Sequence, residues 1–327
     1  MARKYGRFSY CGVITNYTCT ANCAHCMFAS SPNCKKEYMS KQSANRIADI
    51  LLEHGTDSVH IGGGEPFMNF GALCDTVEAL TSRGIMIDYI ETNAFWCQKE
   101  SMVRERLQTL KRLGADTVMA SVDPFHIQFI PLERPLMLID CLRKEHMGFF
   151  IWKEQFLRRL SALDKSVTHS DEELKVLFGE NYIVDCAREY GVKVNGRAMN
   201  IARHIFPLKP ASTYFNSPRC TNLMDGVHCH IDNFEKVVPQ GCPGINIDID
   251  DFAAMELEIE KYPVVSALME GGVKKLYEYA LNKGYKERRD GYSTACELCA
   301  HIRSYLFYNS PSGDIGPKGF YDNLFTE

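Results

Sequence analysis

The chain lacks three features that mark whole classes of protein. No stretch approaches 18 consecutive apolar residues, so we expect no membrane-spanning helix and no membrane partner. No run of five or more like charges occurs and the net charge is −4, which disfavours nucleic acid as the main partner. The basic N-terminus has no apolar core of the kind found in secretory signals, so we expect a cytoplasmic protein.

Cysteine, in contrast, is abundant, with 14 cysteines among 327 residues. A small secreted protein would pair them as disulfides, but this chain is long, has no secretory signal and groups several cysteines in sequence. In a reducing compartment such groups are more often metal ligands, while isolated cysteines are usually small buried hydrophobes. The grouped cysteines therefore predict a metal or iron–sulfur centre.

Segments with strand and helix patterns alternate through the first two-thirds of the chain. The strand candidates are short and mostly apolar: Gly12–Thr15, Ser58–Ile61, Met86–Glu91, Thr117–Ser121, Phe149–Trp152 and Lys193–Asn195. The helix candidates begin at capping residues or end at glycines: Ser40–His54, Asn69–Ser82, Glu100–Leu113 and Ser170–Gly191. This alternation predicts an α/β fold in which right-handed crossovers curl a parallel sheet into a partial (β/α)6 TIM-type barrel.

The alternation stops after Met199, and five prolines follow between residues 205 and 245. The segments Val227–Ile231 and Lys236–Val238 have the pattern of a short hairpin, and Asp251–Asn282 has a mostly helical pattern. We therefore expect two domains, a core over residues 1–204 and a smaller C-terminal domain over residues 205–327.

Three cysteines follow the first predicted strand at the spacing C-x3-C-x2-C: Cys19, Cys23 and Cys26. A structural zinc site needs four ligands, and His25 or a distant cysteine would have to complete it. A [4Fe–4S] cluster held by three cysteines leaves one iron free to bind a small molecule. The triplet alone does not separate these possibilities from coincidence in a cysteine-rich chain.

A glycine-rich segment follows the second predicted strand and reads Gly62-Gly63-Gly64-Glu65-Pro66. Glycines let backbone amides and carbonyls approach a ligand closely, and an acidic side chain beside them suits an ammonium group. Taken alone, the segment is also compatible with a simple glycine turn.

The two motifs together resemble the radical SAM enzymes, whose pattern is a C-x3-C-x2-C loop after the first strand and a GGEP-like motif after the second. Both are present here in the same order, although His25 replaces the usual aromatic residue before the last cysteine. The resemblance implies a [4Fe–4S] cluster with an open iron that binds S-adenosylmethionine. It also implies reductive cleavage of that compound to a 5′-deoxyadenosyl radical, which abstracts hydrogen from a substrate.

The resemblance also suggests roles for polar residues at the strand ends. Backbone and side-chain groups of Gly62, Gly63, Gly64 and Glu65 are expected to face the methionine amino group. The expected ribose contacts are Glu91, Asn93, Ser121 and Asp123, and Arg197 is expected to reach a carboxylate. His126 is a candidate for substrate contact, with a structural role as the alternative.

Five further cysteines lie in the C-terminal part. Their order resembles the shortened auxiliary-cluster extension called twitch or SPASM, in which cysteines flank a hairpin and a late pair completes the site. This resemblance assigns one auxiliary [4Fe–4S] cluster to Cys220, Cys242, Cys296 and Cys299, with four-thiolate zinc as the alternative. Cys229, inside the predicted hairpin, is expected to be a buried thiol or a hydrogen-atom donor near the substrate.

The predicted activity is a modification of a peptide or protein substrate, such as epimerisation or crosslinking of a ribosomally made peptide, with flavodoxin or ferredoxin as electron donor. Two alternatives stay open at this point. One is the same chemistry on a small metabolite. The other is a non-catalytic iron–sulfur or zinc protein, which leaves the glycine motif unexplained.

Overall fold

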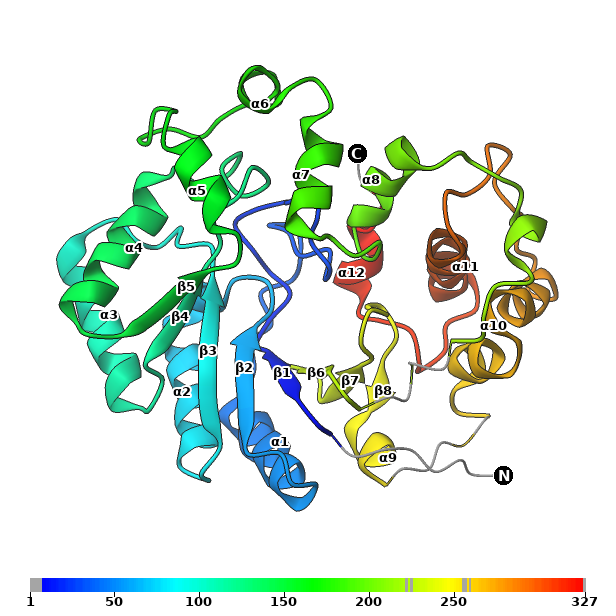
Figure 1. Cartoon of the computed structure of the whole chain (residues 1–327). Helices are drawn as coiled ribbons and strands as arrows, with labels where there is room; N and C mark the ends of the chain where they lie inside the picture. The colour runs from blue at the N-terminus through cyan, green and yellow to red at the C-terminus, as the bar shows by residue number, and fades with distance from the viewer. Residues whose placement is uncertain (1–7, 221–222, 224–225, 255–257, 259, 326–327) are drawn as a thin grey trace.

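The computed structural model describes residues 8–220, 223, 226–254, 258 and 260–325. Figure 1 shows a central sheet with helices α1 to α4 along one side and the C-terminal helices beside its other end. The fold is α/β, with a mainly parallel sheet of the partial-barrel type and a C-terminal extension that adds antiparallel strands. This is the fold class that the sequence predicted.

The first five strands are parallel and lie next to one another in chain order: β1 (Cys11–Ile14), β2 (Ser58–Gly62), β3 (Met86–Thr92), β4 (Thr117–Ala120) and β5 (Gly148–Ile151). All four residues of β1 are buried, as is typical of a strand in a sheet covered on both faces. Since the strands are parallel, their carboxyl ends meet at one edge of the barrel, and the loops that follow them share that edge.

Helices connect these strands as expected: α1 (Lys41–Glu53), α2 (Phe70–Thr81, preceded by the 3₁₀ turn η1, Pro66–Asn69), α3 (Glu100–Arg112), α4 (Glu133–Lys144) and α5 (Glu154–Leu160). Ser40 caps α1 by accepting a hydrogen bond from the Ser43 amide at 3.0 Å, and Asn69 caps α2 in the same way. Both caps satisfy backbone amides that have no partner within the helix. The three helices predicted in this region are therefore confirmed.

Two predicted elements differ from the structure. Lys193–Asn195 is not a strand, because the Asn195 amide turns back to the Lys193 carbonyl and the next residues bind the cysteine loop. The single helix predicted from Ser170 to Gly191 is two helices, α6 (Asp171–Phe178) and α7 (Tyr182–Tyr190). They are separated at Gly179, whose backbone angles (φ 99°, ψ 163°) are incompatible with a helix.

The predicted hairpin is confirmed and extends the core sheet. Its strands are β6 (Cys229–Asp232) and β7 (Lys236–Val238), and β8 (Ile247–Asp248) pairs antiparallel with β7. β6 pairs in parallel with β1, so the strand order is β5-β4-β3-β2-β1-β6-β7-β8. The sixth parallel strand therefore comes from the C-terminal part of the chain and lies beside β1, not after β5.

Helices make up most of the remaining C-terminal part: α8 (Ala198–Ile205), η2 (Ala211–Tyr214), α9 (Ile249–Ala253), α10 (Pro263–Leu281), α11 (Ala295–Asn309) and α12 (Lys318–Asp322). α10 is kinked at Gly271 and Gly272, where the backbone angles are not helical. The predicted helical segment Asp251–Asn282 includes positions 255–257 and 259, which lie outside the described residues.

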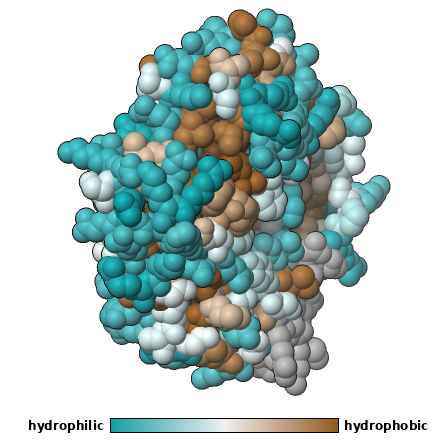
Figure 2. All heavy atoms as spheres, turned by 60° about the vertical axis from the view of Figure 1, so that its left-hand side comes forward, coloured by the Kyte–Doolittle hydropathy of each residue, from teal (hydrophilic) through white to brown (hydrophobic). Residues whose placement is uncertain are grey.

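The face of the molecule in Figure 2 is mainly hydrophilic, and a patch of hydrophobic residues interrupts its upper half. No helix within the described residues is both long and apolar enough to cross a membrane.

Candidate active site

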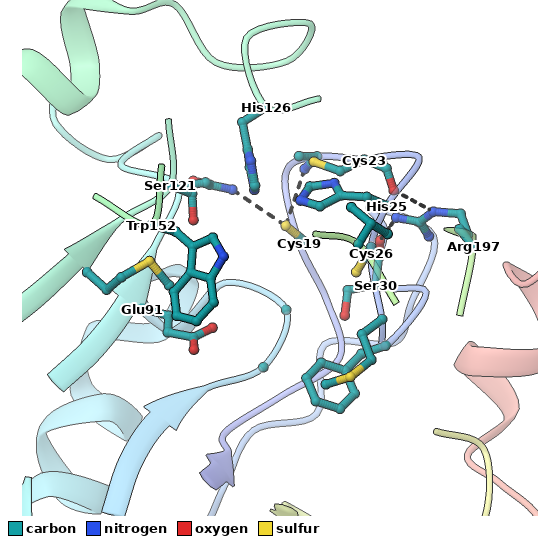
Figure 3. Close-up of a pocket in the computed structure, with 18 of the residues that line it drawn as sticks. Cys19, Cys23, His25, Cys26, Ser30, Glu91, Ser121, His126, Trp152 and Arg197 are labelled. Carbon is teal, nitrogen blue, oxygen red and sulfur yellow. Dashed lines mark hydrogen bonds between the residues drawn. The ribbon is translucent and has the colours of Figure 1, made fainter. Parts of the chain in front are cut away.

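The cysteine loop forms one wall of a cavity of about 360 Å³ at the carboxyl ends of the barrel strands. Figure 3 shows Cys19, Cys23 and Cys26 close together on this loop, with Glu91 and Trp152 on the opposite side of the cavity. All three cysteines line the cavity. The loop begins directly after β1, so a buried strand fixes its starting point.

The three sulfur atoms do not form a closely spaced group of ligand atoms in this structure. Within the described residues, no three cysteines bring their Sγ atoms within 4.8 Å of one another. Four thiolates around one zinc ion, with Zn–S bonds of about 2.3 Å, would lie about 3.8 Å apart. A cubane cluster binds each thiolate at a different iron and therefore needs wider spacing. Three thiolates on one loop match the number of protein ligands of a cluster with one open iron.

The triple-glycine bend packs directly against the start of this loop. The Gly64 amide donates to the Asn16 carbonyl at 2.7 Å, and the Glu65 amide donates to the Thr18 carbonyl at 2.9 Å. A β-carbon on Gly64 would lie 2.0 Å from the Thr18 carbonyl oxygen, so only glycine permits this approach. Gly63 and Gly64 line the cavity, whereas Gly62 ends β2 and does not.

The Glu65 side chain differs from the prediction because it does not line the cavity. It is 1% exposed, and its carboxylate accepts hydrogen bonds from the Phe67 amide (3.1 Å), the Asn93 amide (2.7 Å) and the Thr92 hydroxyl (2.9 Å). Burial raises its pKa to about 7, although these hydrogen bonds act in the opposite direction. Glu65 therefore links the glycine bend to the end of β3 and does not face a bound ligand.

Three of the predicted ribose contacts line the cavity, namely Glu91, Asn93 and Ser121. The Asn93 amide group donates to Cys19 Sγ at 3.5 Å and to the Thr20 hydroxyl at 3.2 Å, so it also holds the cysteine loop. Burial raises the pKa of Glu91 to about 7. A carboxyl group with this pKa can accept or donate a hydrogen bond near neutral pH.

Asp123 was also predicted to contact the ribose. It does not line the main cavity, which differs from that prediction. Its carboxylate is 2.8 Å from Nδ1 of His126, and this pair is buried beside the cysteine loop. Burial alone would raise the pKa of Asp123, but His126 and His25 lower it to about 2. His126 does line the cavity, and its position is set by Asp123.

Arg197 fastens the cysteine loop from a distant part of the chain. Its Nε donates to the Cys23 carbonyl at 2.9 Å, one Nη donates to the Ser30 carbonyl at 2.7 Å, and its amide donates to the Cys26 carbonyl at 3.0 Å. The other Nη is buried without a hydrogen-bond partner among the described residues, and Arg197 lines the cavity. The sequence predicted a ligand contact here but missed the role in holding the loop.

Gly196 explains how this segment comes so close. Its φ is +53°, and a β-carbon there would lie 2.2 Å from the Met27 carbonyl oxygen and 2.4 Å from that of Cys26. The signal in the sequence was the dipeptide Gly196-Arg197 after a short apolar segment, which is too general to identify a loop clamp.

Four of the C-terminal cysteines are near enough to one another that neighbouring thiols act on the pKa of Cys220 and of Cys242. Burial raises the pKa of Cys220 and of Cys242 to about 12, and neighbouring cysteine thiols contribute: Cys299, Cys242 and Cys296 for Cys220, and Cys299 and Cys296 for Cys242. Cys296 and Cys299 both lie near the start of α11.

Arg303, on the same helix, is 2% exposed and donates to the Pro243 carbonyl at 2.9 Å. Burial acts to lower the pKa of its guanidinium, but Tyr321, Cys299 and Cys242 together raise that pKa above its ordinary value. This group of thiols therefore has a buried positive charge beside it.

The structure places Cys229 outside the cavity and so does not support the hydrogen-donor role expected for it. Its Sγ is fully buried and lies 3.4 Å from Sγ of Cys11 on the neighbouring strand. Alternate residues of a strand face opposite sides of the sheet, so His228 and His230 line the cavity and Cys229 points away from it. Cys229 is thus a buried thiol, which was the other expectation.

The fold and site together define an α/β enzyme core with a three-cysteine loop at the carboxyl ends of its strands. Residues 13–134 match the family model of the radical SAM superfamily. Over these residues the chain is similar to the radical SAM superfamily enzymes, a class that uses a [4Fe–4S] cluster and S-adenosylmethionine. No curated protein sequence matches the chain.

Several solved structures are similar in fold. One is titled native anSMEcpe with bound AdoMet, with 14% identity, a TM-score of 0.44 and coverage of 91% of this chain and 97% of that chain. Another is SuiB of Streptococcus suis bound to the precursor peptide SuiA, with 12% identity, a TM-score of 0.36 and coverage of 90% and 76%. A third is BtrN in complex with AdoMet and 2-DOIA, with 18% identity, a TM-score of 0.38 and coverage of 82% and 89%.

Proposed function

We propose that this enzyme uses a radical derived from S-adenosylmethionine to abstract hydrogen from a peptide or protein substrate. The observation that carries the proposal is the single cavity shared by the cysteine loop, the glycine bend and the polar ends of β3 and β4. Cys19, Cys23 and Cys26 would hold the cluster. When bound, the cluster and S-adenosylmethionine together supply a 5′-deoxyadenosyl radical, the hydrogen-abstracting species of this superfamily.

The chain's own residues position these cofactors and limit the entry of water. The backbones of Gly63 and Gly64 leave the cavity wall free of side chains where the methionine part of the cofactor is expected. Glu91, Asn93 and Ser121 offer hydrogen-bonding groups on the opposite wall. The Arg197 guanidinium has one buried Nη without a partner among the described residues, and this group suits the cofactor's carboxylate.

The proposed second centre is an auxiliary [4Fe–4S] cluster on Cys220, Cys242, Cys296 and Cys299. The proximity of these four thiols supports it. All 14 cysteines are free, which suits a reducing cytoplasm with flavodoxin or ferredoxin as the electron donor.

A peptide substrate is favoured by the way in which the cavity reaches the surface. Trp152 lines the cavity, yet 55% of its surface is exposed. The cavity wall therefore extends to the surface of the protein. A side chain can therefore enter while the rest of a larger substrate stays outside. Because Cys229 faces away from the cavity, we favour crosslinking or oxidation over an epimerisation that uses this thiol. A small metabolite is the second candidate, since the cavity volume lies within the range of small-ligand sites.

The test is anaerobic reconstitution followed by reduction in the presence of S-adenosylmethionine. We expect about eight irons per chain from two four-iron clusters, and formation of 5′-deoxyadenosine. Cys23→Ala should abolish nucleoside formation, and the isolated Cys74→Ala should not. A fully loaded sample that forms no 5′-deoxyadenosine would refute the proposal. Mass spectrometry of short peptides and of small metabolites offered as substrates would then separate the two substrate classes.

A further inference from the structure

Three histidines form a group in the wall of the same cavity. His60 lies on β2, His230 lies on β6 and His228 directly precedes β6, and all three line the cavity. Their ring centroids are 5.1 to 5.5 Å apart. Each ring offers a nitrogen such that the three nitrogens lie within 4.8 Å of one another.

Gly12 of β1 makes this arrangement possible. β1 lies between β2 and β6, and Gly12 is in register with His60 on one side and with His230 on the other. A β-carbon on Gly12 would lie 2.4 Å from Nε2 of His60 and 2.4 Å from Cδ2 of His230. The two imidazoles therefore meet over a strand position that only glycine can occupy.

The three rings have few polar partners. Nδ1 of His60 and Nε2 of His228 are buried and have no hydrogen-bond partner within the described part of the chain. The surrounding rings belong to Tyr10 and Tyr89, which stack on His60, and to Phe28, which contacts His230 edge-on. A buried ring nitrogen without a partner is unfavourable unless something else binds it.

We propose that His60, His228 and His230 bind one divalent transition-metal ion, such as Zn²⁺ or Fe²⁺, with its remaining coordination positions open to the cavity. Three imidazoles with an open position form a ligand set that first-row ions accept. This centre is separate from both cysteine sites.

The geometry needs only a small adjustment to bind an ion. In a tetrahedral site with metal–nitrogen bonds of about 2.0–2.1 Å, the nitrogens lie about 3.3 Å apart. Since the three nitrogens are already within 4.8 Å, side-chain rotation would have to close the widest pair by at most about 1.5 Å. The cavity itself provides the entry path.

The open coordination positions of the proposed metal ion indicate which kind of ligand it would bind. Lys193 lines the same cavity, and its charge acts on His228. A carboxylate bound to the ion would therefore also meet an ammonium group. The structure points to an anchor for a carboxylate-bearing substrate inside the cavity. This assignment of role, unlike the metal site itself, depends on the proposed function.

The test uses the reconstituted holoenzyme, in which the cluster cysteines are already occupied. Co²⁺ is titrated anaerobically with the clusters in their oxidised, EPR-silent form. We expect one Co²⁺ per chain, with ¹⁴N modulation from imidazole in the pulsed EPR signal. His228→Ala should weaken Co²⁺ binding at least about tenfold. The matched control is His204→Ala, because His204 is exposed on α8, outside the cavity.

The variants also distinguish loss of the site from loss of the fold. His228 is only half-buried, and retention of cluster iron in His228→Ala would show that the chain is intact. Absence of stoichiometric Co²⁺ binding, or equal affinity in His228→Ala and wild type, would overturn the proposal. Acetate should perturb the Co²⁺ signal, and a signal indifferent to acetate would refute the open position. A chain that binds Co²⁺ here but makes no 5′-deoxyadenosine would refute the proposed function and leave the metal site standing.

Discussion

Arg197 donates a hydrogen bond from its Nε to the carbonyl oxygen of Cys23 at 2.9 Å, although the two residues are 174 positions apart in sequence. The cysteine loop has no regular secondary structure of its own to fix it. Its shape depends on this guanidinium, on the Asn93 amide group and on the glycine bend. The loop that is expected to hold the cluster is therefore held by three separate parts of the barrel.

Arg197→Lys tests the first of these contacts. An ammonium group cannot reproduce both hydrogen bonds of the planar guanidinium, so one loop carbonyl would lose its partner. We expect the free energy of unfolding to fall by about 2–4 kcal/mol and the iron content at the N-terminal cluster to fall with it. Urea unfolding and iron analysis measure the two effects. Arg188→Lys, on the exposed face of α7, should change neither, and an unaffected Arg197→Lys would contradict the clamp.

Gly64→Ala tests the glycine bend. The new β-carbon would lie 2.0 Å from the Thr18 carbonyl oxygen, which is backbone and cannot move without the cysteine loop. We expect a loss of about 1–3 kcal/mol in the free energy of unfolding and reduced cluster loading. Gly313→Ala is the control because a β-carbon there meets nothing within 4 Å. Equal stability and iron content in the two variants would show that the loop tolerates displacement.

The raised pKa of Glu65 predicts a pH dependence of stability. Its pKa is about 7 in the folded chain, above its ordinary value of 4.5, so the folded state keeps this proton to higher pH than the unfolded state. Stability from this group is therefore fully present at low pH and is lost as pH rises towards 7. Relative to Glu65→Gln, which does not titrate, wild type should lose about 2 kcal/mol between pH 5.5 and pH 8. Urea unfolding of both proteins across that range gives the difference, and a constant difference would mean that Glu65 is ionised throughout.

The local motifs were the part of the site that the sequence could predict. The cysteine triplet and the glycine bend each depend on spacing within a few residues, and the alternation of strands and helices places both at the same edge of the sheet. The barrel strands β1 to β5 and the hairpin follow from the same short-range patterns. Each of these features leaves a signal that a single sequence shows.

Features that depend on register between distant strands were not predictable. Cys229 was expected near the substrate, but its pairing with Cys11 on β1 turns it away from the cavity. That same register brings His60 and His230 together over Gly12. The segment Lys193–Asn195 resembled a strand because three residues carry too little pattern to distinguish a strand from a segment that binds a loop.

Cys220 and Cys229 are the two candidates for one ligand position of the proposed auxiliary cluster. Their alanine variants are expected to differ in iron content. If Cys220 belongs to the auxiliary cluster, Cys220→Ala should lower the iron content from about eight to about four per chain. Cys229→Ala should retain the iron and the formation of 5′-deoxyadenosine, because this thiol lies against Cys11, away from both sites. Iron analysis after anaerobic reconstitution decides between them. Loss of iron in Cys229→Ala alone would exchange the two assignments.

The buried charge of Arg303 should raise the reduction potential of the proposed auxiliary cluster. The net charge of a cluster with four thiolate ligands becomes more negative when the cluster is reduced. A nearby guanidinium stabilises this reduced state. Arg303→Met should therefore shift the potential to more negative values by about 60 mV, which corresponds to about 1.4 kcal/mol for a one-electron couple. Redox titration followed by EPR measures the shift, with Arg112→Met on the exposed face of α3 as the control. Unchanged potential in an Arg303→Met sample with full iron content would place the cluster away from this helix.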